Sequence, residues 1–592
     1  MKDFFKFTFA TVTGIILSCV VLFFGGMLIL FSALASSEAE TQVSSNSVMM
    51  LELKGELRER YEAMPYETLF SDDYQIYGLD DILSSIRKAK ENENIKGIYL
   101  QLSYLTAGYA AIEEIRNTLL DFKESGKFVI AYADNYQQSL YYLASVADKV
   151  LMNPKGSLEW RGIASTPVFY KDLLEKIGVE MQIFKVGTYK SAVEPFIATE
   201  MSPANREQVT AYIHSVWDAV TQAVSESRNI SIDKLNRYAD NMIMFEPSEE
   251  AVKCGLVDTL IYKNNVRDYL KPLVGLDKDD NLPVLELQDM VNVHKNQPKD
   301  KSGNIVAVYY ASGEIVDYGS TFTLLSDQPT IITSKVIRDL RRLQENDDVK
   351  AVVLRINSPG GSAYGSEQLW YAISQLKKEK PVIVSMGEYA ASGGYYMSCN
   401  ADTIVAEPTT LTGSIGIFGM YPNVKGLTDK IGLDFDVVKT NEYADFGATG
   451  RPMNEGEKAL MQKMVNQGYD LFLTRCSEGR GIAREELDKI AQGRVWTGST
   501  AKELGLVDEL GGLDRALEIA CRKAGIDAYT VVSYPAKQTF LEMLMSTNLG
   551  SYLKSRFLSG KAGELYRQFS ILENFDKRDR IQARLPFELN IE

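Results

Sequence analysis

The chain has 592 residues, of which 45% are hydrophobic and 24% are charged, as in an ordinary globular protein. This length is more than one hydrophobic core normally serves, and it indicates two domains of about 250 residues each. The formal net charge is −15 at pH 7, with no basic tract to offset it, which argues against a nucleic-acid partner.

The N-terminus carries a long uncharged stretch that predicts a membrane anchor. Lys2 and Lys6 precede Phe7 to Ala35, which are 29 residues without a charge, and about 20 apolar residues suffice to cross the hydrocarbon core. Basic residues tend to stay on the cytoplasmic side, so we expect the body of the protein on the far side of the membrane. Ala33-Leu34-Ala35 resembles a cleavage site, but the apolar stretch is longer than that of a secretory signal, which favours an uncleaved anchor.

The rest of the chain repeats itself with an ungapped offset of 254 residues. Lys171 to Gly178 and Lys425 to Gly432 match at five of eight positions. The same offset pairs further residues: Tyr142 with Tyr396, Asp148 with Asp402, Pro154 with Pro408, Gly162 with Gly416, Lys185 with Lys439, and Tyr189 with Tyr443. Similarity at a fixed period is typical of a duplicated architecture. We therefore expect two related domains.

Both copies alternate short apolar runs with helical segments, which predicts an α/β fold. In the second copy the predicted strands are Ile305–Tyr310, Ala351–Ile356 and Pro381–Ser385, and the predicted helices are Thr333–Gln344, Gly365–Lys378 and the segment after Ser392. In the first copy the matching strands are Ile95–Leu102 and Phe128–Tyr132.

The composition along the chain predicts five parts. Residues 1–45 are the anchor, 46–262 the first copy, 263–303 a polar linker, 304–535 the second copy and 536–592 a C-terminal extension. Within the extension, Phe540–Leu544 and Tyr552–Phe557 have helical apolar spacing, and Arg584–Ile591 is a candidate strand.

Histidine is scarce, which narrows the possible catalytic chemistry. His214 lies in the helical stretch Glu207–Ser227, and His294 lies in the polar linker. Neither is a promising member of a Ser-His-Asp triad or of a metal site, and the cysteines form no C-x-x-C pair. If a serine acts as a nucleophile here, we expect its base to be a residue other than histidine.

Two glycine-rich turns each follow a predicted strand and open a helix. They are Asn357–Ser362 and Ser392-Gly393-Gly394. Glycine allows close approach to the backbone N–H groups exposed at such turns. A tight turn without any further role is the alternative, but two adjacent strand ends can aim N–H donors at one point, as an oxyanion hole requires. The candidates for oxyanion or substrate contact are Gly360, Gly361 and Gly393.

Ser392 and Lys190 are the candidate catalytic pair. Ser392 stands at the second glycine turn, and Lys190 follows the strand-like segment Met181–Val186. A serine hydroxyl needs a base in order to attack a carbonyl, and a lysine serves when burial lowers its pKa. By itself Lys190 also fits a surface lysine. The repeat favours the pair, because Ser392 falls opposite Gln138 and Lys190 opposite Ala444, so each copy retains one half.

Four motifs together resemble a known family: Tyr189-Lys190-Ser191, Ser358–Ser362, Ala391–Tyr396 and Thr412–Gly416. They are similar to the bacterial signal peptide peptidase A family, also called protease IV, in its long duplicated form. The resemblance runs from the anchor to about residue 530. It implies tandem Clp-protease-like or crotonase-like domains and a Ser-Lys dyad, with Ser392 as nucleophile and Lys190 as general base.

The same resemblance implies where the protein works and on what. It implies a single-pass protein of the bacterial inner membrane with its catalytic body on the periplasmic or outer side. The substrates would be signal peptides left after secretion, and the enzyme would be a homo-oligomer, a tetramer by family resemblance. Hydrolysis of a peptide by such a dyad proceeds by acyl transfer to the serine and then to water, and this reaction needs no metal or cofactor.

Ser414 is a candidate supporting residue. In the turn Thr412-Gly413-Ser414 its hydroxyl is placed to hydrogen-bond the Lys190 amine and help keep it neutral, as the third member of a triad orients its neighbour. A serine that only forms the turn is the alternative. The equivalent position in the first copy is Trp160. We also expect apolar cover over the amine from Phe196 and Tyr189.

Two other classes of function stay open at this stage. The crotonase-like fold also serves acyl-CoA chemistry, in which two N–H groups hold an enolate and no serine nucleophile is needed. The second alternative is that the protein is an inactive membrane scaffold. Labelling of Ser392 by a serine-directed phosphonate, or lack of acyl-CoA binding, would exclude the acyl-CoA class. The distance from Lys190 to Ser392 discriminates an inactive scaffold from a peptidase. The sequence does not decide whether the pair forms within one chain or between neighbouring chains.

Overall fold

The computed structural model describes residues 40–61, 75–293, 302–317, 329–537 and 581–584, together with scattered positions between 6 and 25. Within these residues, no helix combines the length and the apolar character that crossing a membrane requires. The predicted anchor, Phe7 to Ala35, falls largely outside the described residues. So do His294, the candidate helical segments Phe540–Leu544 and Tyr552–Phe557, and all of the candidate strand Arg584–Ile591 except its first residue.

The first copy is built on a parallel sheet of seven strands, in the order β2-β1-β3-β4-β5-β7 with β8 beside β1. Its strands are β1 (Ser47–Arg58), β2 (Gln75–Gly78), β3 (Ile95–Thr106), β4 (Phe128–Ala133), β5 (Lys149–Met152), β7 (Thr259–Leu260) and β8 (Val284–Leu285). The predicted strands Ile95–Leu102 and Phe128–Tyr132 lie within β3 and β4. Because both faces of a parallel sheet are covered, its strands are continuous apolar runs, and in β4 five of six residues are buried.

The helices of the first copy are α2 (Leu79–Glu91), α3 (Tyr109–Lys123), α4 (Gln138–Ala144), α5 (Lys171–Ile177), α6 (Glu194–Ile197), α7 (Pro203–Arg228), α8 (Ile232–Asp240) and α9 (Ser248–Lys253). The predicted linker contains α10 (Val266–Leu270), β8 and α11 (Leu287–Val291). Met290 and Val293 from this segment are buried in the core of the first copy. Residues up to Val293 therefore pack as part of that copy.

The second copy has a sheet of eight strands, in the order β18-β16-β14-β12-β9-β20, with β15 beside β14 and β19 beside β15. These strands are β9 (Ile305–Ser312), β12 (Val349–Ser358), β14 (Val382–Ala391), β15 (Thr403–Ala406), β16 (Leu411–Gly413), β18 (Val495–Thr497), β19 (Glu509–Leu510) and β20 (Thr530–Tyr534). The predicted strand Pro381–Ser385 continues to Ala391, directly before the second glycine turn.

The helices of the second copy are α12 (Thr333–Glu345), α13 (Ala363–Glu379), α14 (Gly393–Ser398), α15 (Lys425–Ile431), α16 (Glu455–Arg480), α17 (Arg484–Ile490), α18 (Gly498–Glu503) and α19 (Leu513–Ala524). The predicted helices Thr333–Gln344 and Gly365–Lys378 lie within α12 and α13, and the helix after Ser392 is α14. These elements confirm the α/β class.

The duplication is visible in equivalent hydrogen bonds. In the first copy the Val150 N–H donates to Asp258 Oδ2 at 2.7 Å. In the second copy the Ile404 N–H donates to Asp508 Oδ2, also at 2.7 Å. Asp258 ties β5 to the segment after the short helix α9, and Asp508 ties β15 to the segment after the short helix α18. The two copies therefore share side-chain contacts as well as strand order.

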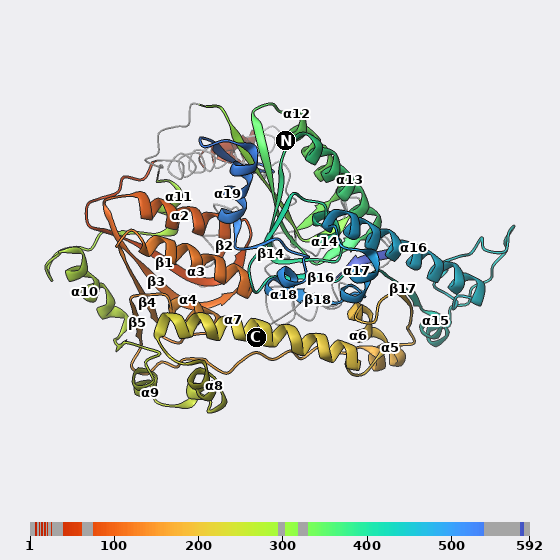
Figure 1. Cartoon of the computed structure of the whole chain (residues 1–592), viewed down its shortest axis with the longest axis horizontal. Helices are drawn as coiled ribbons and strands as arrows, with labels where there is room; N and C mark the ends of the chain where they lie inside the picture. Colours follow the sequence, from red (N-terminus) through yellow and green to blue (C-terminus); the bar gives the residue numbers. More distant parts are fainter. Residues whose placement is uncertain are drawn as a thin grey trace.

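A third sheet joins the two copies. Its order is β11-β10-β13-β21-β17-β6, with β6 (Glu180–Lys185) from the first copy and β10 (Glu314–Val316), β11 (Thr330–Ile332), β13 (Gly360–Ser362), β17 (Phe418–Asn423) and β21 (Ile581–Arg584) from the remainder of the chain. β6 pairs antiparallel with β17 over its whole length. After β6 the chain returns along α7, the long helix that runs beneath both halves of the molecule (Figure 1).

A buried ionic cluster also ties the copies together. The Arg355 guanidinium on β12 contacts Glu59 at 2.8 Å and Glu114 at 2.7 Å, and all three side chains are buried. Burial by itself lowers the pKa of Arg355, but the carboxylates of Glu114 and Glu59 raise it overall, so the guanidinium stays charged. Removing one partner of such a buried pair typically costs about 3–5 kcal/mol. The cluster therefore favours one fixed arrangement of the two copies.

Candidate active site

Ser392 occupies a strained turn between β14 and α14. Its φ is 54° and its ψ is −112°, and its N–H donates to Gly413 O at 2.8 Å. A non-glycine residue in such a conformation costs about 1–3 kcal/mol, and such strain is concentrated at functional sites. A sharp strand-to-helix turn is also how nucleophilic serines are presented at the end of the sheet in α/β-hydrolases.

Lys190 reaches Ser392 within the same chain. Its Nζ lies 2.7 Å from Ser392 Oγ, and 3.0 Å from both the Oγ and the carbonyl oxygen of Ser414. Lys190, Ser392 and Ser414 are all fully buried. Burial lowers the pKa of Lys190 well below its ordinary value, because the ammonium form loses its hydration. The amine is thus in an environment that favours its neutral, basic form.

The stem of Lys190 packs against two glycines that the sequence analysis did not assign to the site. A Cβ on Gly493, whose φ is +77°, would lie 2.6 Å from Lys190 Cβ, and a Cβ on Gly416 would lie 3.3 Å from Lys190 Cδ. A side chain at Gly493 would therefore displace the lysine. Gly416 appeared in the sequence as the repeat partner of Gly162 and as the last residue of the motif Thr412–Gly416, and Gly493 had no signal beyond its turn.

Gln208 on α7 is a second residue that the sequence did not indicate. Its Nε2 donates to Tyr189 O at 3.0 Å and to Ser191 Oγ at 2.8 Å, and its Oε1 accepts from the Val495 N–H at 3.2 Å. The side chain therefore ties both neighbours of Lys190 to β18 of the second copy.

The aromatic side chains expected to cover the amine have other prominent contacts. The Tyr189 ring lies 4.6 Å beneath the Arg494 guanidinium. Phe196 stacks on Tyr170 in a small apolar cluster with residues of β6 and β17. The contacts of Lys190 with Gly416 and Gly493 therefore describe the surroundings of its side chain more directly than these two aromatic residues do.

The two glycine turns meet beside Ser392. Gly360 and Gly361 have φ values of +99° and +155°, which only glycine adopts readily. A Cβ on Gly360 would lie 2.7 Å from the Gly393 nitrogen. The Gly360 N–H donates to Ser358 Oγ at 3.1 Å, so its own donor is occupied. Gly393 is the first residue of α14, where the N–H has no partner inside the helix.

The first copy has no equivalent pair. At the position of Ser392 it has Gln138, whose Oε1 accepts from the N–H groups of Arg161 and Gly162, each at 2.9 Å. The Gln138 Nε2 donates to Tyr109 Oη at 2.9 Å and to Gly162 O at 3.1 Å. The Gln138 side-chain amide therefore forms hydrogen bonds through both its oxygen and its nitrogen with the groups around it. Ala444, opposite Lys190 in the repeat, is exposed in the loop after α15.

Neither Trp160 nor His214 contributes to the surroundings of Lys190 and Ser392. Trp160, at the repeat position of Ser414, is buried in the first copy, and its Nε1 donates to Leu235 O at 2.9 Å. His214 is exposed on α7, with Nδ1 2.8 Å from Thr210 O of its own helix.

Known proteins resemble this chain over most of its length. The sequence profile of peptidase family S49 matches residues 121–277 and 374–527, one segment in each copy. Protease 4 of Haemophilus influenzae is 36% identical over 523 residues, covering 84% of this chain and 83% of that protein. Protease 4 of Salmonella typhi is 39% identical over 490 residues, covering 81% and 78%.

More distant likenesses extend this set. The chloroplastic serine protease SPPA of Arabidopsis thaliana is 31% identical over 531 residues, covering 88% of this chain and 76% of that protein. Among solved structures, a ClpP1 mutant from Listeria monocytogenes covers 36% of this chain and 94% of its own, at 16% identity and a TM-score of 0.24. A likeness this weak does not assign a fold.

Proposed function

The chain belongs to peptidase family S49 and is of the protease IV type, and from this premise we propose that it is a membrane-anchored serine endopeptidase with a Ser-Lys dyad. In this proposal Ser392 is the nucleophile and Lys190 is the general base. The observation that carries the proposal is the 2.7 Å separation between Lys190 Nζ and Ser392 Oγ in a fully buried setting.

The proposed reaction is acyl transfer to water. Lys190 takes the Ser392 proton as the hydroxyl oxygen attacks a peptide carbonyl carbon, and then gives a proton to the departing amine. The N–H groups of Gly361 and Gly393 stabilise the tetrahedral oxyanion. Water, deprotonated by Lys190, then hydrolyses the acyl-enzyme. Ser414 orients the amine throughout. Gly360 allows the close approach of the two turns and contributes no free donor, since its N–H is bonded to Ser358.

The proposed substrates are cleaved signal peptides and other apolar peptides. Signal sequences carry an apolar core of about 7–15 residues. The uncharged stretch Phe7 to Ala35 behind Lys2 and Lys6 supports a single-pass anchor in the bacterial inner membrane, with the catalytic body on the outer side. An enzyme anchored there is close to such peptides. The family resemblance further favours Clp-protease-like or crotonase-like domains and a homo-tetramer.

The acyl-CoA alternative and the inactive scaffold are less well supported. Relatives over most of the chain are named proteases, and an enolate-stabilising site has no need of a buried lysine against a serine hydroxyl. The first copy fits the description of an inactive site, since Gln138 fills the nucleophile position, but this does not extend to the second copy.

Two variants and one reagent test the proposal. Ser392→Ala and Lys190→Ala should each remove nearly all hydrolysis of an apolar reporter peptide. A serine-directed phosphonate should label Ser392 in the parent protein and leave Ser392→Ala unlabelled. Parent-like turnover by either variant would contradict the dyad, and binding of an acyl-CoA without phosphonate labelling would favour the other enzyme class.

A further inference from the structure

Two buried cysteines of the second copy face each other at the end of α14, the short helix that follows Ser392. Cys399 comes directly after the last residue of α14, and Cys476 lies near the end of α16. Both side chains are fully buried in the same apolar core. Burial, and after it a hydrogen bond with the Cys399 thiol, raises the pKa of the Cys476 thiol well above its ordinary value. The two sulfur atoms are therefore neighbours although they are far apart in the sequence.

The packing of α14 on α16 places these cysteines opposite each other. The Tyr396 ring stacks on the Phe472 ring, with the centroids 4.3 Å apart and an angle of 7° between the planes. Cys399 comes three positions after Tyr396. Cys476 comes four positions after Phe472, so each cysteine lies one helical turn beyond a ring of the stack. A Cβ on Gly479 would lie 2.4 Å from the Cys399 carbonyl oxygen, so the two main chains are also close at this point.

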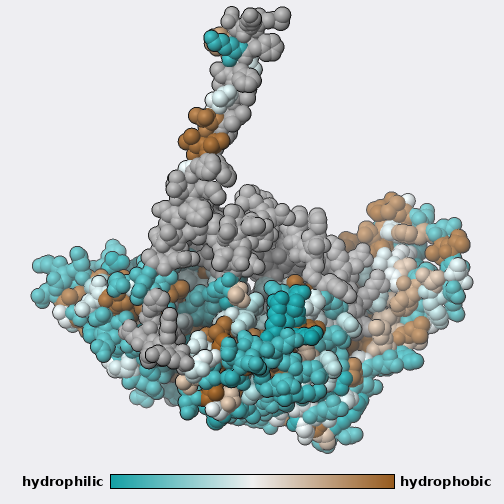
Figure 2. Space-filling view, turned by 90° about the horizontal axis from the view of Figure 1, so that it is seen from above, coloured by the Kyte–Doolittle hydropathy of each residue, from teal (hydrophilic) through white to brown (hydrophobic). Residues whose placement is uncertain are grey.

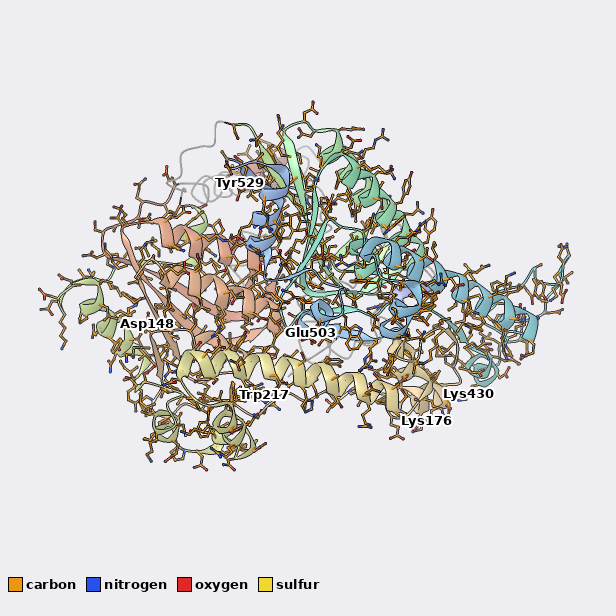
Figure 3. The ribbon with its side chains drawn as sticks, viewed as in Figure 1. Asp148, Lys176, Trp217, Lys430, Glu503 and Tyr529 are labelled. Carbon is orange, nitrogen blue, oxygen red and sulfur yellow. The ribbon has the colours of Figure 1, made fainter. Side chains whose placement is uncertain are left out.

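The other two cysteines that the structure describes lie elsewhere. Cys521 is on α19, in a core on the opposite face of the sheet formed by β9, β12 and β14 from the core that holds Cys399 and Cys476. Tyr529 packs against the core of Cys521, and Figure 3 shows Tyr529 well away from α16. Cys254 packs against the core of the first copy. Among the described cysteines, Cys399 therefore has Cys476 as its partner.

The first copy has neither thiol at the equivalent positions. α7 and α16 each have 26 residues, and their last five residues match at three positions, which makes Val224 the counterpart of Cys476. At the offset of 254 residues, Ser145 is the counterpart of Cys399. Ser145 and Val224 are both buried, so a serine and a valine fill this place in the fold equally well. The two cysteines occur together in the copy that carries Ser392.

The surroundings of the two thiols decide when they can react. Two cysteines are bridged without backbone movement only where their side chains point toward each other, and thiols that hydrogen-bond each other meet this condition. In the folded chain neither thiol reaches the surface, which carries mostly hydrophilic side chains on the face that Figure 2 shows. The thiolate is the reacting form, and burial disfavours it. A reaction with an external oxidant therefore takes place during folding, before α16 covers α14.

We propose that Cys399 and Cys476 form a disulfide bond that fixes α14 to α16 behind the Ser392 turn. The bond forms by exchange with an oxidant that itself carries a disulfide. The thiolate of one cysteine attacks this disulfide, and the thiolate of the other displaces the oxidant from the mixed disulfide. The two thiols lose two protons and two electrons, and the oxidant is reduced to two thiols. Such oxidants act outside the cytoplasm, so the proposal rests on the outer location given under the proposed function for its oxidant, and it is independent of the dyad.

The bond acts on the position of the proposed oxyanion donor. Gly393 is the first residue of α14, and Cys399 caps the same helix at its other end. α14 lies between α13 and α16 (Figure 1), and a covalent link to α16 holds the whole short helix in one place. The link thereby keeps the Gly393 N–H in a fixed position relative to Ser392.

Peptide mapping of the full-length protein tests the bond. Protein isolated from bacterial membranes is unfolded in a thiol-alkylating reagent without reductant and then digested. We expect the peptide that contains Cys399 to be linked to the peptide that contains Cys476, and Cys254 and Cys521 to be alkylated. Reduction before alkylation should separate the linked peptides. Ser392→Ala should give the same linked pair, because the bond requires no peptidase activity.

Unfolding in urea measures the effect of the bond on stability. A disulfide restricts the unfolded chain, so the parent protein should unfold at a lower urea concentration when a reductant is present. Cys476→Ala should unfold at the same urea concentration with and without the reductant. The matched control is Cys521→Ala, which should respond to the reductant as the parent does. An equal response of Cys476→Ala and the parent would overturn the proposal.

The outcomes separate this proposal from the proposed function. Alkylation of both Cys399 and Cys476 without prior reduction, in protein from membranes and also in protein refolded with oxidised and reduced glutathione, overturns the disulfide whatever the peptidase activity. A linked pair in the refolded protein alone supports the contact of the thiols and contradicts the proposed outer location. A linked protein that takes no phosphonate on Ser392 contradicts the dyad and leaves the disulfide established.

Discussion

The Lys190 Nζ and the Ser392 Oγ lie 2.7 Å apart although 202 residues separate them in the chain. The first copy supplies the lysine because β6 leaves its own domain and pairs with β17 of the second copy. Gln208 and Gly493 then hold the segment around Lys190 against β18 and the turn before it. The candidate pair is thus completed within one chain.

Mixing inactive chains should therefore restore no activity. Ser392→Ala and Lys190→Ala each retain only one member of the pair, and an intact pair would have to be assembled from two chains. We expect a mixture of the two variants, refolded together, to hydrolyse an apolar peptide no faster than either alone. A refolded parent protein is the control for recovery, and recovered activity would place the two residues on neighbouring chains.

The activity should fall as the pH is lowered. Burial lowers the pKa of Lys190 well below its ordinary value, so the neutral base is present above that lowered pKa and is lost as the pH falls through it. We expect kcat/KM to be level above this point and to drop tenfold per pH unit below it. A profile that rises only near the ordinary pKa of lysine, about 10.4, would contradict a buried neutral amine.

Ser414→Ala should weaken catalysis without abolishing it. The Ser414 hydroxyl lies 3.0 Å from the Lys190 amine, and one hydrogen bond of this kind contributes about 1 kcal/mol, or roughly a factor of 5 in rate. We expect kcat to fall by about fivefold with KM unchanged. The control is Ser398→Ala, a buried serine whose hydroxyl donates to Gly394 O within α14. Equal losses for both variants would mean that Ser414 has only a structural role.

Restoring a serine in the first copy should not create a second active site. In Gln138→Ser the hydroxyl would stand where the amide now accepts from Arg161 and Gly162, but the position equivalent to Lys190 is Ala444, which is exposed in the loop after α15. We expect phosphonate labelling to remain at one site per chain, on Ser392. Labelling of the new serine would show that a base is present there.

The stability should depend on the ionisation of Glu388. This buried carboxylate accepts from the Ala110 N–H at 3.0 Å, and burial raises its pKa to about 7. Because the folded-state pKa is above the unfolded one, the proton stabilises the fold below about pH 4.5, and this stability is lost as the pH rises through 7. The parent should therefore lose up to about 3 kcal/mol relative to Glu388→Gln between pH 5 and 8.

Chemical denaturation at several pH values measures this difference. The exposed substitution Glu503→Gln is the control, and it should follow the parent at every pH. A free-energy difference between the parent and Glu388→Gln that stays constant from pH 5 to 8 would contradict the raised pKa.

Many of the strands and helices were predictable, because the apolar patterns that mark them lie within short stretches of the sequence. The strands β3, β4, β9 and β12 contain the predicted apolar runs, and helices α12 and α13 follow from their spacing of apolar residues. β14 was the least complete prediction among these, because its last residues up to Ala391 include glycine, glutamate and alanine, which do not have the pattern of an apolar strand.

Some residues of the candidate active site could not be predicted from any pattern in the nearby sequence. Gly493 is required by contact with Lys190, more than 300 positions earlier in the chain, and Gln208 is a polar residue on a long helix like many others. The predicted strand Arg584–Ile591 lies outside the described residues except for Arg584. The strand β21, Ile581–Arg584, was not predicted, because its pairing depends on the edges of β13 and β17.

By itself, the sequence determined that the chain is a duplicated α/β protein, that Ser392 stands at a glycine turn, and that Ser392 and Lys190 each lack a counterpart in the other copy of the repeat. These conclusions follow from periodicity and from the repeat, which require no knowledge of distant contacts. Only the tertiary structure decided that the two residues meet within one chain, because their distance depends on the pairing of β6 with β17. The burial that lowers the pKa of Lys190 likewise arises only when both copies pack around it.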